Sequence, residues 1–130
     1  QQHVEDFPMG RILGIAALAA LTITPAFAAG DAASGSAVFA RCAICHSNAK
    51  GAPNRVGPNL FGVSGRKAGT VPDFSYSTAM KSSGITWTDD KLTAYVMHPQ
   101  LVVPGNRMAF GGISSQGQAA DLVAYLDTLK

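Results

Sequence analysis

Apolar positions recur with helical spacing toward the carboxyl end of the chain, and no stretch shows the strict alternation of a strand. From Ser114 or Ser115 onward they follow the i, i+3, i+4, i+7 rule, which predicts an amphipathic helix. Its apolar members are Ala119, Leu122, Val123, Leu126 and Leu129. Thr88, with two aspartates after it, predicts the beginning of another helix, which we expect to end at Pro99.

The amino-terminal half of the domain carries weaker helical signals. Asp31 is a good N-cap and predicts a first helix over 32–45, and a short helix is expected over Ser77–Ser83. Residues 48–74 contain G-A-P, G-P, G-V-S-G and V-P-D without sustained periodicity, which indicates loop. Helices joined by long glycine-rich loops predict an all-α fold.

The first residues differ in character from the rest. Starting at Met9, one basic residue precedes an apolar run, a proline and the small residues of an A-x-A site, a pattern typical of a secretory signal. We expect cleavage after Ala28, which leaves residues 29–130 as one domain. The alternative is an uncleaved membrane anchor over residues 12–29, whose length is borderline for a bilayer. Export would place the protein in the periplasm.

Composition fits a single globular domain. The chain has 130 residues, of which 47% are hydrophobic and 14% charged, and this charged fraction argues against disorder. Residues 29–130 hold nine Lys and Arg against six Asp, a formal charge of +3. Such a mild excess falls short of a nucleic-acid-binding surface, so no nucleic-acid partner is expected, but it can steer docking on an acidic protein. We expect a monomer.

The only two cysteines lie in the motif C-A-I-C-H, formed by Cys42, Cys45 and His46. In helical geometry these positions are i, i+3 and i+4, so their side chains share one face. Two thiols at this spacing can add to the vinyl groups of a haem while the imidazole reaches its iron, so C-x-x-C-H indicates c-type haem attachment.

Three other uses of the cysteines compete with haem attachment. A zinc site needs four ligands, and beyond the cysteines only His46 and His98 are good candidates. A thioredoxin-like dithiol requires a βαβ context, of which the sequence has no sign. A structural disulfide would close a very small loop and gain little stability. We therefore expect one covalently attached haem c per chain.

Further short motifs occur in order along the chain: G-D-A-A-S-G, V-G-P-N-L-F-G, G-R-K-A-G, F-S-Y, G-I-T-W, P-G-N-R-M-A-F and D-L-V-A-Y-L. With C-A-I-C-H they resemble the class I cytochromes c, of the mitochondrial and soluble purple-bacterial kind, from about Gly30 to Lys130. The resemblance implies the small cytochrome c fold, with helices and long loops wrapped around the haem. It also implies that Gly35 and Tyr125 meet where the first and last helices cross.

The candidates for a second iron ligand are Met80, Met97, Met108 and His98. Met108 lies in a loop bracketed by glycine and proline, where a side chain is free of helix geometry, whereas Met80 and Met97 fall in predicted helices. The family places its methionine ligand in this loop, so we expect iron ligation by His46 and Met108. Histidine with methionine favours the reduced iron and raises its potential.

The resemblance implies further site residues. The carbonyl of Pro58 would accept a hydrogen bond from the ligand histidine and fix its tautomer. Tyr76 and Trp87 would bond a haem propionate, with Arg66 as the nearby cation, and Tyr95 would lie beside Met108. The alternatives are a turn proline, core packing and a surface arginine. Pocket residues implied in the same way are Phe39, Leu60, Leu122 and Leu126.

An iron with both axial positions filled by the protein favours electron transfer over substrate chemistry. We expect a single-electron carrier and not an enzyme. Its donor would be a membrane quinol:cytochrome c reductase, and its acceptor a cytochrome c oxidase or a photosynthetic reaction centre. The alternatives are a membrane-tethered relay subunit and a haem peroxidase.

One departure from the family concerns docking. Its relatives carry many lysines around the haem edge, whereas this chain has Arg41, Arg55 and Arg107 near it. Leu101 and other uncharged residues occupy neighbouring positions. The smaller number of cations around the haem edge predicts a partner whose surface is less acidic, or docking that depends more on apolar contact.

Overall fold

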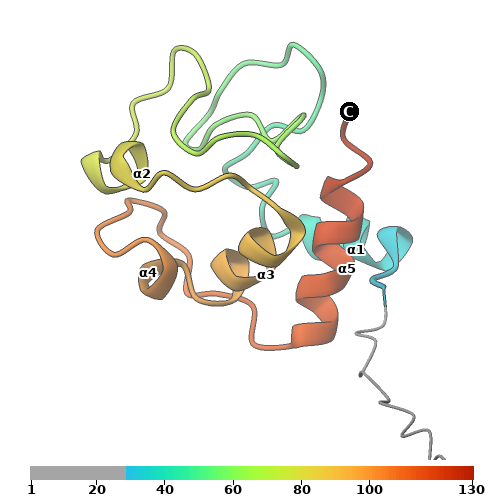
Figure 1. Ribbon diagram of the computed structural model, residues 1–130. Helices are drawn as coiled ribbons and strands as arrows, with labels where there is room; N and C mark the ends of the chain where they lie inside the picture. The colour runs from blue at the N-terminus through green and yellow to red at the C-terminus, as the bar shows by residue number, and fades with distance from the viewer. Residues whose placement is uncertain (1–28) are drawn as a thin grey trace, which may run out of the picture.

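The computed structural model describes residues 29–130, and its regular elements are five helices (Figure 1). They are α1 (Ala32–Phe39), α2 (Thr78–Ser82), α3 (Asp89–Met97), α4 (Pro99–Val102) and α5 (Gln116–Leu126). Within this part of the chain, extended pairing is limited to one isolated bridge between Lys67 and Thr86. The all-α class is confirmed. The expected signal, its cleavage site and most of the alternative anchor lie outside the described residues.

Side-chain caps begin the helices where the sequence predicts them. The Asp31 carboxylate accepts hydrogen bonds from the amides of Ala33 and Ser34 at the start of α1. Ser77, Thr88 and Ser115 each accept a bond from the amide three residues further on, at α2, α3 and α5. Each cap satisfies an amide that has no partner inside its helix.

The prediction that the first helix continues to residue 45 is wrong, because α1 ends at Phe39. After that residue the amides of Ala40 and Arg41 bond to carbonyls three residues back, at 3.3 and 3.2 Å. This is the tighter 3₁₀ pattern that often ends an α-helix. The chain goes on winding in single turns as far as His46.

Helix α3 ends at Met97, shortly before Pro99 as predicted, but Pro99 also opens α4, which was not predicted. A proline fits the first position of a helix because the amide it lacks would have no partner there. The last helix is shorter than its apolar pattern indicates: α5 ends at Leu126, and turns carry the chain past Leu129.

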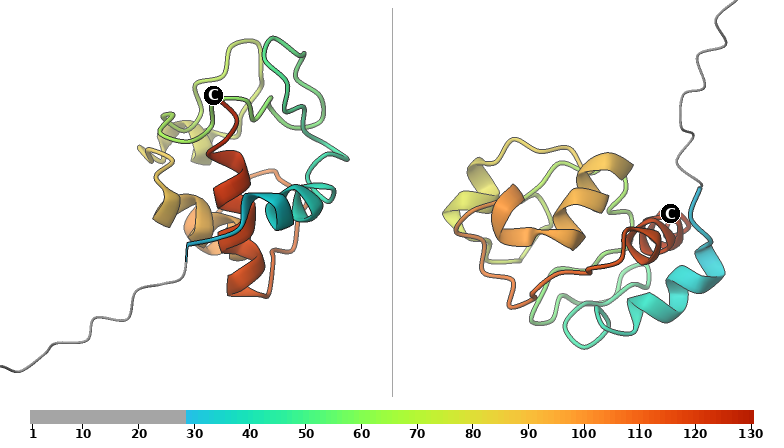
Figure 2. Two further views of the ribbon diagram at one scale, coloured as in Figure 1. Left: turned by 90° about the vertical axis from the view of Figure 1, so that its right-hand side faces the viewer. Right: turned by 90° about the horizontal axis from the view of Figure 1, so that it is seen from below.

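Helices α1 and α5 come from opposite ends of the domain and cross in direct contact (Figures 1 and 2). A Cβ atom on Gly35 would lie 1.9 Å from the carbonyl oxygen of Asp121 and 2.8 Å from Cβ of Tyr125. No larger residue allows this approach. The rings of Phe39 and Tyr125 pack beside it with centroids 5.2 Å apart. The expected meeting of Gly35 and Tyr125 is confirmed.

The buried core joins this crossing to the rest of the domain. Its members come from α1, α3, α5 and the connecting segments, and they are Phe39, Val63, Ala68, Trp87, Leu92, Tyr95, Val103, Ile113, Ala119, Leu122, Val123 and Leu126. Leu60 packs against this cluster and is half-buried. In residues 29–130 no helix combines the length and the apolar character needed to cross a bilayer.

Candidate functional site

The C-x-x-C-H motif forms a single tight turn just beyond α1. The carbonyl of Cys42 accepts hydrogen bonds from the amides of Cys45 and His46, at 3.0 and 2.9 Å. The three residues therefore share one turn, as the spacing predicts. Cys42 packs against the core, and burial raises the pKa of its thiol. The two cysteines are not bonded to each other.

His46 is held by the segment that contains Pro58. Its Nδ1 lies 2.7 Å from the Pro58 carbonyl oxygen. Because a carbonyl can only accept, Nδ1 carries the proton and Nε2 keeps its lone pair. Burial lowers the pKa of His46, against the opposing effect of the Pro58 bond, and the nearby charges of Arg55 and Arg66 lower it further. The ring is therefore neutral and offers one nitrogen to a metal.

Gly57 supports the same ring and was not predicted. A Cβ atom at this buried position would lie 2.3 Å from Cε1 of His46 and 2.6 Å from its Nδ1. The Gly57 amide also donates to the Cys45 carbonyl at 2.9 Å. The imidazole thus lies flat against bare backbone on one side. The signal was present in V-G-P, where only a glycine leaves this space.

Met108 lies in the loop between α4 and α5 and is half-buried. Its Sδ atom is 4.0 Å from the hydroxyl of Tyr95, which α3 supplies. Tyr95 in turn packs on Trp87, with ring centroids 4.9 Å apart. Burial raises the pKa of Tyr95 to about 12. The expected contact between Tyr95 and Met108 is confirmed.

The other two candidate methionines, Met80 and Met97, occupy helices. Met80 lies in α2 and Met97 ends α3, and both pack against the core. His98 is exposed and follows α3. A helical side chain has its direction set by the helix, so these residues are less free than Met108 to be aimed at a metal.

Arg66 links the other two members of the implied propionate cluster, Tyr76 and Trp87. Its carbonyl accepts a hydrogen bond from the Trp87 amide at 2.9 Å. Burial lowers the pKa of its guanidinium, and the charge of Tyr76 opposes this effect. The Tyr76 hydroxyl accepts a bond from the Val71 amide at 3.1 Å. Within residues 29–130 the indole N–H of Trp87 donates to no protein group and its nitrogen is not fully enclosed, so it can donate to a further acceptor.

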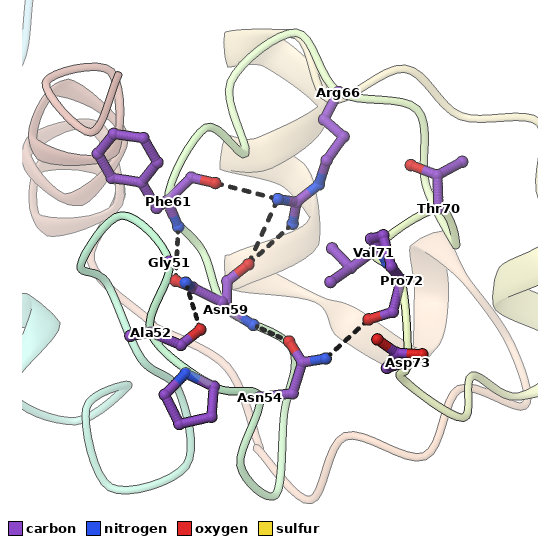
Figure 3. A pocket seen from close by; sticks show the side chains of 11 residues that line it. Gly51, Ala52, Asn54, Asn59, Phe61, Arg66, Thr70, Val71, Pro72 and Asp73 are labelled. Atoms are coloured by element: carbon purple, nitrogen blue, oxygen red, sulfur yellow. Dashed lines mark hydrogen bonds between the residues drawn. The ribbon is translucent and has the colours of Figure 1, made fainter.

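Next to this cluster is a cavity of ≈560 Å³, which Figure 3 shows from close by. The Arg66 guanidinium projects into it and donates to the carbonyls of Asn59 and Phe61 at 3.3 and 3.2 Å. Asn54 bridges its two walls, donating to Pro72 O at 2.9 Å and accepting from the Asn59 amide at 2.9 Å. Neither His46 nor Met108 lines this cavity, so the cavity is not the space between the two expected iron ligands.

These donors form one chemical set. Two thiols and an imidazole share a turn, a thioether beside a buried phenol comes from a distant loop, and Arg66 is linked to Trp87 by a backbone bond and to Tyr76 by charge. The imidazole ring occupies the space that a Cβ atom at Gly57 would fill. The set fits a flat iron cofactor bound through sulfur and carrying carboxylate side groups. The class is that of small proteins with covalently attached haem.

Comparison with known proteins agrees. The family model described as Cytochrome c matches residues 32–130. Cytochrome c2 from Blastochloris viridis is 46% identical over 115 residues, covering 88% of this chain and 89% of the relative. Cytochrome c from Euglena viridis is 45% identical over 102 residues, covering 78% and 99%. The solved structure of cytochrome cH from Methylobacterium extorquens superposes with a TM-score of 0.72 at 43% identity, covering 76% of this chain and 99% of that one.

The chain belongs to the cytochrome c family. Like the family, it carries one covalently attached haem c with iron, and Cys42 and Cys45 fit the attachment motif. It shuttles electrons between redox partners and is not an enzyme.

Proposed function

We propose that this protein is a periplasmic carrier of single electrons in which Cys42 and Cys45 form the thioether links and His46 and Met108 ligate the iron. The haem supplies reversible one-electron chemistry when it is bound. With both ligands supplied by the protein, the iron would have no site left for a substrate. That arrangement would favour electron transfer over chemistry at the iron.

The observation that carries this proposal is the hold on His46. The 2.7 Å contact with Pro58 fixes the neutral tautomer, and Gly57 fixes the plane of the ring. A ligand histidine of this kind typically uses its second nitrogen in a bond to a carbonyl, which orients the ring and increases its basicity. Nε2 would then be the nitrogen that binds the iron.

Met108 would supply the second ligand. A thioether is a soft, neutral donor that favours the reduced iron and raises the potential. The Tyr95 hydroxyl lies 4.0 Å from its Sδ atom, a weak contact that leaves the thioether lone pairs available to a metal. Tyr76 and Trp87 would donate to a propionate, and Arg66 would balance its charge.

The proposed donor is a membrane quinol:cytochrome c reductase, and the acceptor is an oxidase or a photosynthetic reaction centre. The surface beside the attachment turn supports docking of mixed character. The Arg55 guanidinium donates to the carbonyls of Ala43 and Ile44, at 2.7 and 3.1 Å. Ile44 and Val56 expose 71% and 79% of their surface on either side. A fixed cation flanked by aliphatic groups fits a carboxylate set among apolar residues.

Ligation is tested with the variant Met108→Ala in the haem-loaded protein, with Met80→Ala and Met97→Ala as matched controls. We expect Met108→Ala to lose the weak red sulfur-to-iron charge-transfer band, to bind cyanide readily and to have a lower potential. Both controls should keep the band. A Met108→Ala protein with the wild-type band and potential would refute the assignment.

Docking is tested by measuring electron transfer with purified reductases, oxidases and reaction centres at increasing salt. We expect a weak decrease in rate with salt, and a larger loss for Ile44→Ser than lysine-rich relatives would show at the same position. A steep salt dependence with no effect of Ile44→Ser would contradict the mixed surface.

A further inference from the structure

The loop that carries Met108 has no long helix to support it. We define the methionine loop as residues 98–108, which include the four-residue helix α4 and then irregular chain. The side chain of Met108 has one polar contact among the described residues, the 4.0 Å approach to Tyr95. A sulfur acceptor at this distance contributes little. The position of Met108 therefore depends on what holds its backbone.

A single buried side chain lies at the centre of this loop. Asn106 is 7% exposed and is the only buried polar residue in the part of the chain that the structure describes. Its Nδ2 donates to the carbonyls of Pro99 and Val103, both at 2.9 Å. Its Oδ1 accepts from the Met108 amide, also at 2.9 Å. One side chain thus links both ends of α4 to the backbone of Met108.

Gln100 reinforces the same connection from outside. Its Nε2 donates to the Asn106 carbonyl at 3.0 Å, and its Oε1 accepts from the Gly105 amide at 3.2 Å. Gly105 has φ +86°, a left-handed conformation that strongly favours glycine. The turn at Gly105 and Asn106 is therefore fixed in one backbone conformation. Arg107 adds a single exposed bond to the Ser75 carbonyl at 3.1 Å.

We propose that Asn106 is the positioning residue for Met108, since its three bonds hold the methionine backbone against α4 and so keep the thioether in place. This proposal rests on the proposed function, in which Met108 ligates the iron. An unbonded polar group buried here would cost stability, so the loop has few other conformations open to it. Asn106 acts through the backbone and does not itself touch the iron.

Mutation can separate the bonds that Asn106 donates to α4 from the bond that it accepts from the Met108 amide. Asn106→Ser keeps a short acceptor for the Met108 amide, because a serine hydroxyl forms the same local turn more weakly, but it cannot reach the α4 carbonyls. Asn106→Ala removes both halves. Asn54→Ala is the matched control, since Asn54 also bridges two loop segments through one donated and one accepted bond. Its bonds join it to Asn59 and Pro72 and do not involve the methionine loop.

The experiment uses the ferric, haem-loaded protein at neutral pH. It measures the rate of cyanide binding, the charge-transfer band and global unfolding in guanidinium. We expect cyanide to bind about tenfold faster in Asn106→Ala and less than that in Asn106→Ser, with Asn54→Ala close to wild type. The charge-transfer band should weaken most in Asn106→Ala, less in Asn106→Ser and least in Asn54→Ala. Asn54→Ala should nevertheless lose about as much global stability as Asn106→Ala.

Each outcome decides the matter. Equal acceleration in Asn106→Ala and Asn54→Ala, or none in either, would overturn the positioning role and leave only a structural one. If Asn106→Ala does not fold, Asn106→Ser alone is compared with Asn54→Ala on the same criteria. If Met108→Ala binds cyanide no faster than wild type, the ligation itself is wrong and the proposed function fails. If Met108→Ala opens the site but neither Asn106 variant does, only the positioning role fails.

Discussion

The two expected iron ligands are held in different ways. The histidine side, residues 42–58, fixes His46 through a tight turn, a carbonyl 2.7 Å away and a backbone surface with no room for a Cβ atom. The methionine loop, residues 98–108, holds Met108 through hydrogen bonds of Asn106 and Gln100. The close packing of His46 on the Gly57 backbone can change only if the backbone moves. The hydrogen bonds of the methionine loop, by contrast, can be replaced by bonds to water.

This difference assigns the two sides separate tasks. Under the proposed ligation, the histidine side would hold the cofactor and one ligand wherever the chain is folded. The methionine loop would set the potential and would be where a small ligand enters. We therefore expect changes on the histidine side to affect folding and changes in the methionine loop to affect ligand entry.

The largest effect is expected for Cys42→Ala. Cys42 packs against the core, and its thioether link would join the cofactor to that core, so most folded haem protein should be lost. Yield and thermal unfolding of the purified protein measure this. Cys45 is absent from the residues that pack on the core, so Cys45→Ala should cost less. Recovery of normally folded, haem-free Cys42→Ala protein would refute the prediction.

Gly57→Ala should come next. The added Cβ would lie 2.3 Å from the His46 ring, which cannot turn away without losing Pro58. We expect a loss of about 3 kcal/mol in the free energy of unfolding, the upper range for overpacking. Gly111→Ala is the control, because nothing lies within 4 Å of its added methyl group. Similar stabilities for the two variants would mean that the histidine side is more yielding than its geometry indicates.

A smaller effect is expected for Gln100→Ala, which removes the outer part of the hold on the methionine loop. Loss of two partly exposed bonds should lower stability by about 1 kcal/mol and speed cyanide binding about threefold. Stopped-flow absorbance gives the rate. Arg107→Ala, which removes one exposed bond, should change it less. The reverse order would show that the loop is held from Ser75 rather than from α4.

The smallest effect is expected far from both ligands, at Asp89. Partial burial, with the charge of Asp127, raises the pKa of this carboxyl above its ordinary value of 3.8. The fold therefore favours the protonated form, so its contribution is complete below pH 3.8 and is lost as pH rises through the raised value. Asp89→Asn should unfold at a slightly higher temperature than wild type at neutral pH, and the difference should vanish in acid.

This change also sharpens the comparison of the two sides. Cyanide binding should be the same in Asp89→Asn and wild type, because a gain in global stability does not tighten the methionine loop. Asp90→Asn serves as the control on the neighbouring position of α3. Slower cyanide binding in Asp89→Asn would show that ligand entry follows global unfolding.

Local signals in the sequence predicted much of this structure. Asp31, Thr88 and Ser115 cap helices within one residue of the expected places, because a cap depends on a side chain and the next three amides. The spacing in C-A-I-C-H placed two cysteines and a histidine on one turn for the same reason.

Features that depend on distant contacts were missed. The end of α1 at Phe39 leaves no trace in the apolar pattern, which continues to Ile44 although Ile44 is exposed. The role of Gly57 depends on a ring eleven positions earlier in the chain. Asn106 looks like an ordinary turn residue in P-G-N, and only the fold reveals that it is buried against α4.

The crossing of α1 and α5 has a consequence for the order of events during folding. The amide of Asp31 donates to the Asp121 carboxylate at 2.8 Å across 90 positions of sequence, so this contact closes nearly the whole domain into a ring. Closing so long a loop costs conformational entropy that only the finished interface repays, and contacts this remote slow folding. Since α5 follows the other described helices in the chain, its crossing with α1 can form only once α5 is available. The close contact at Gly35 then joins the two ends of the domain.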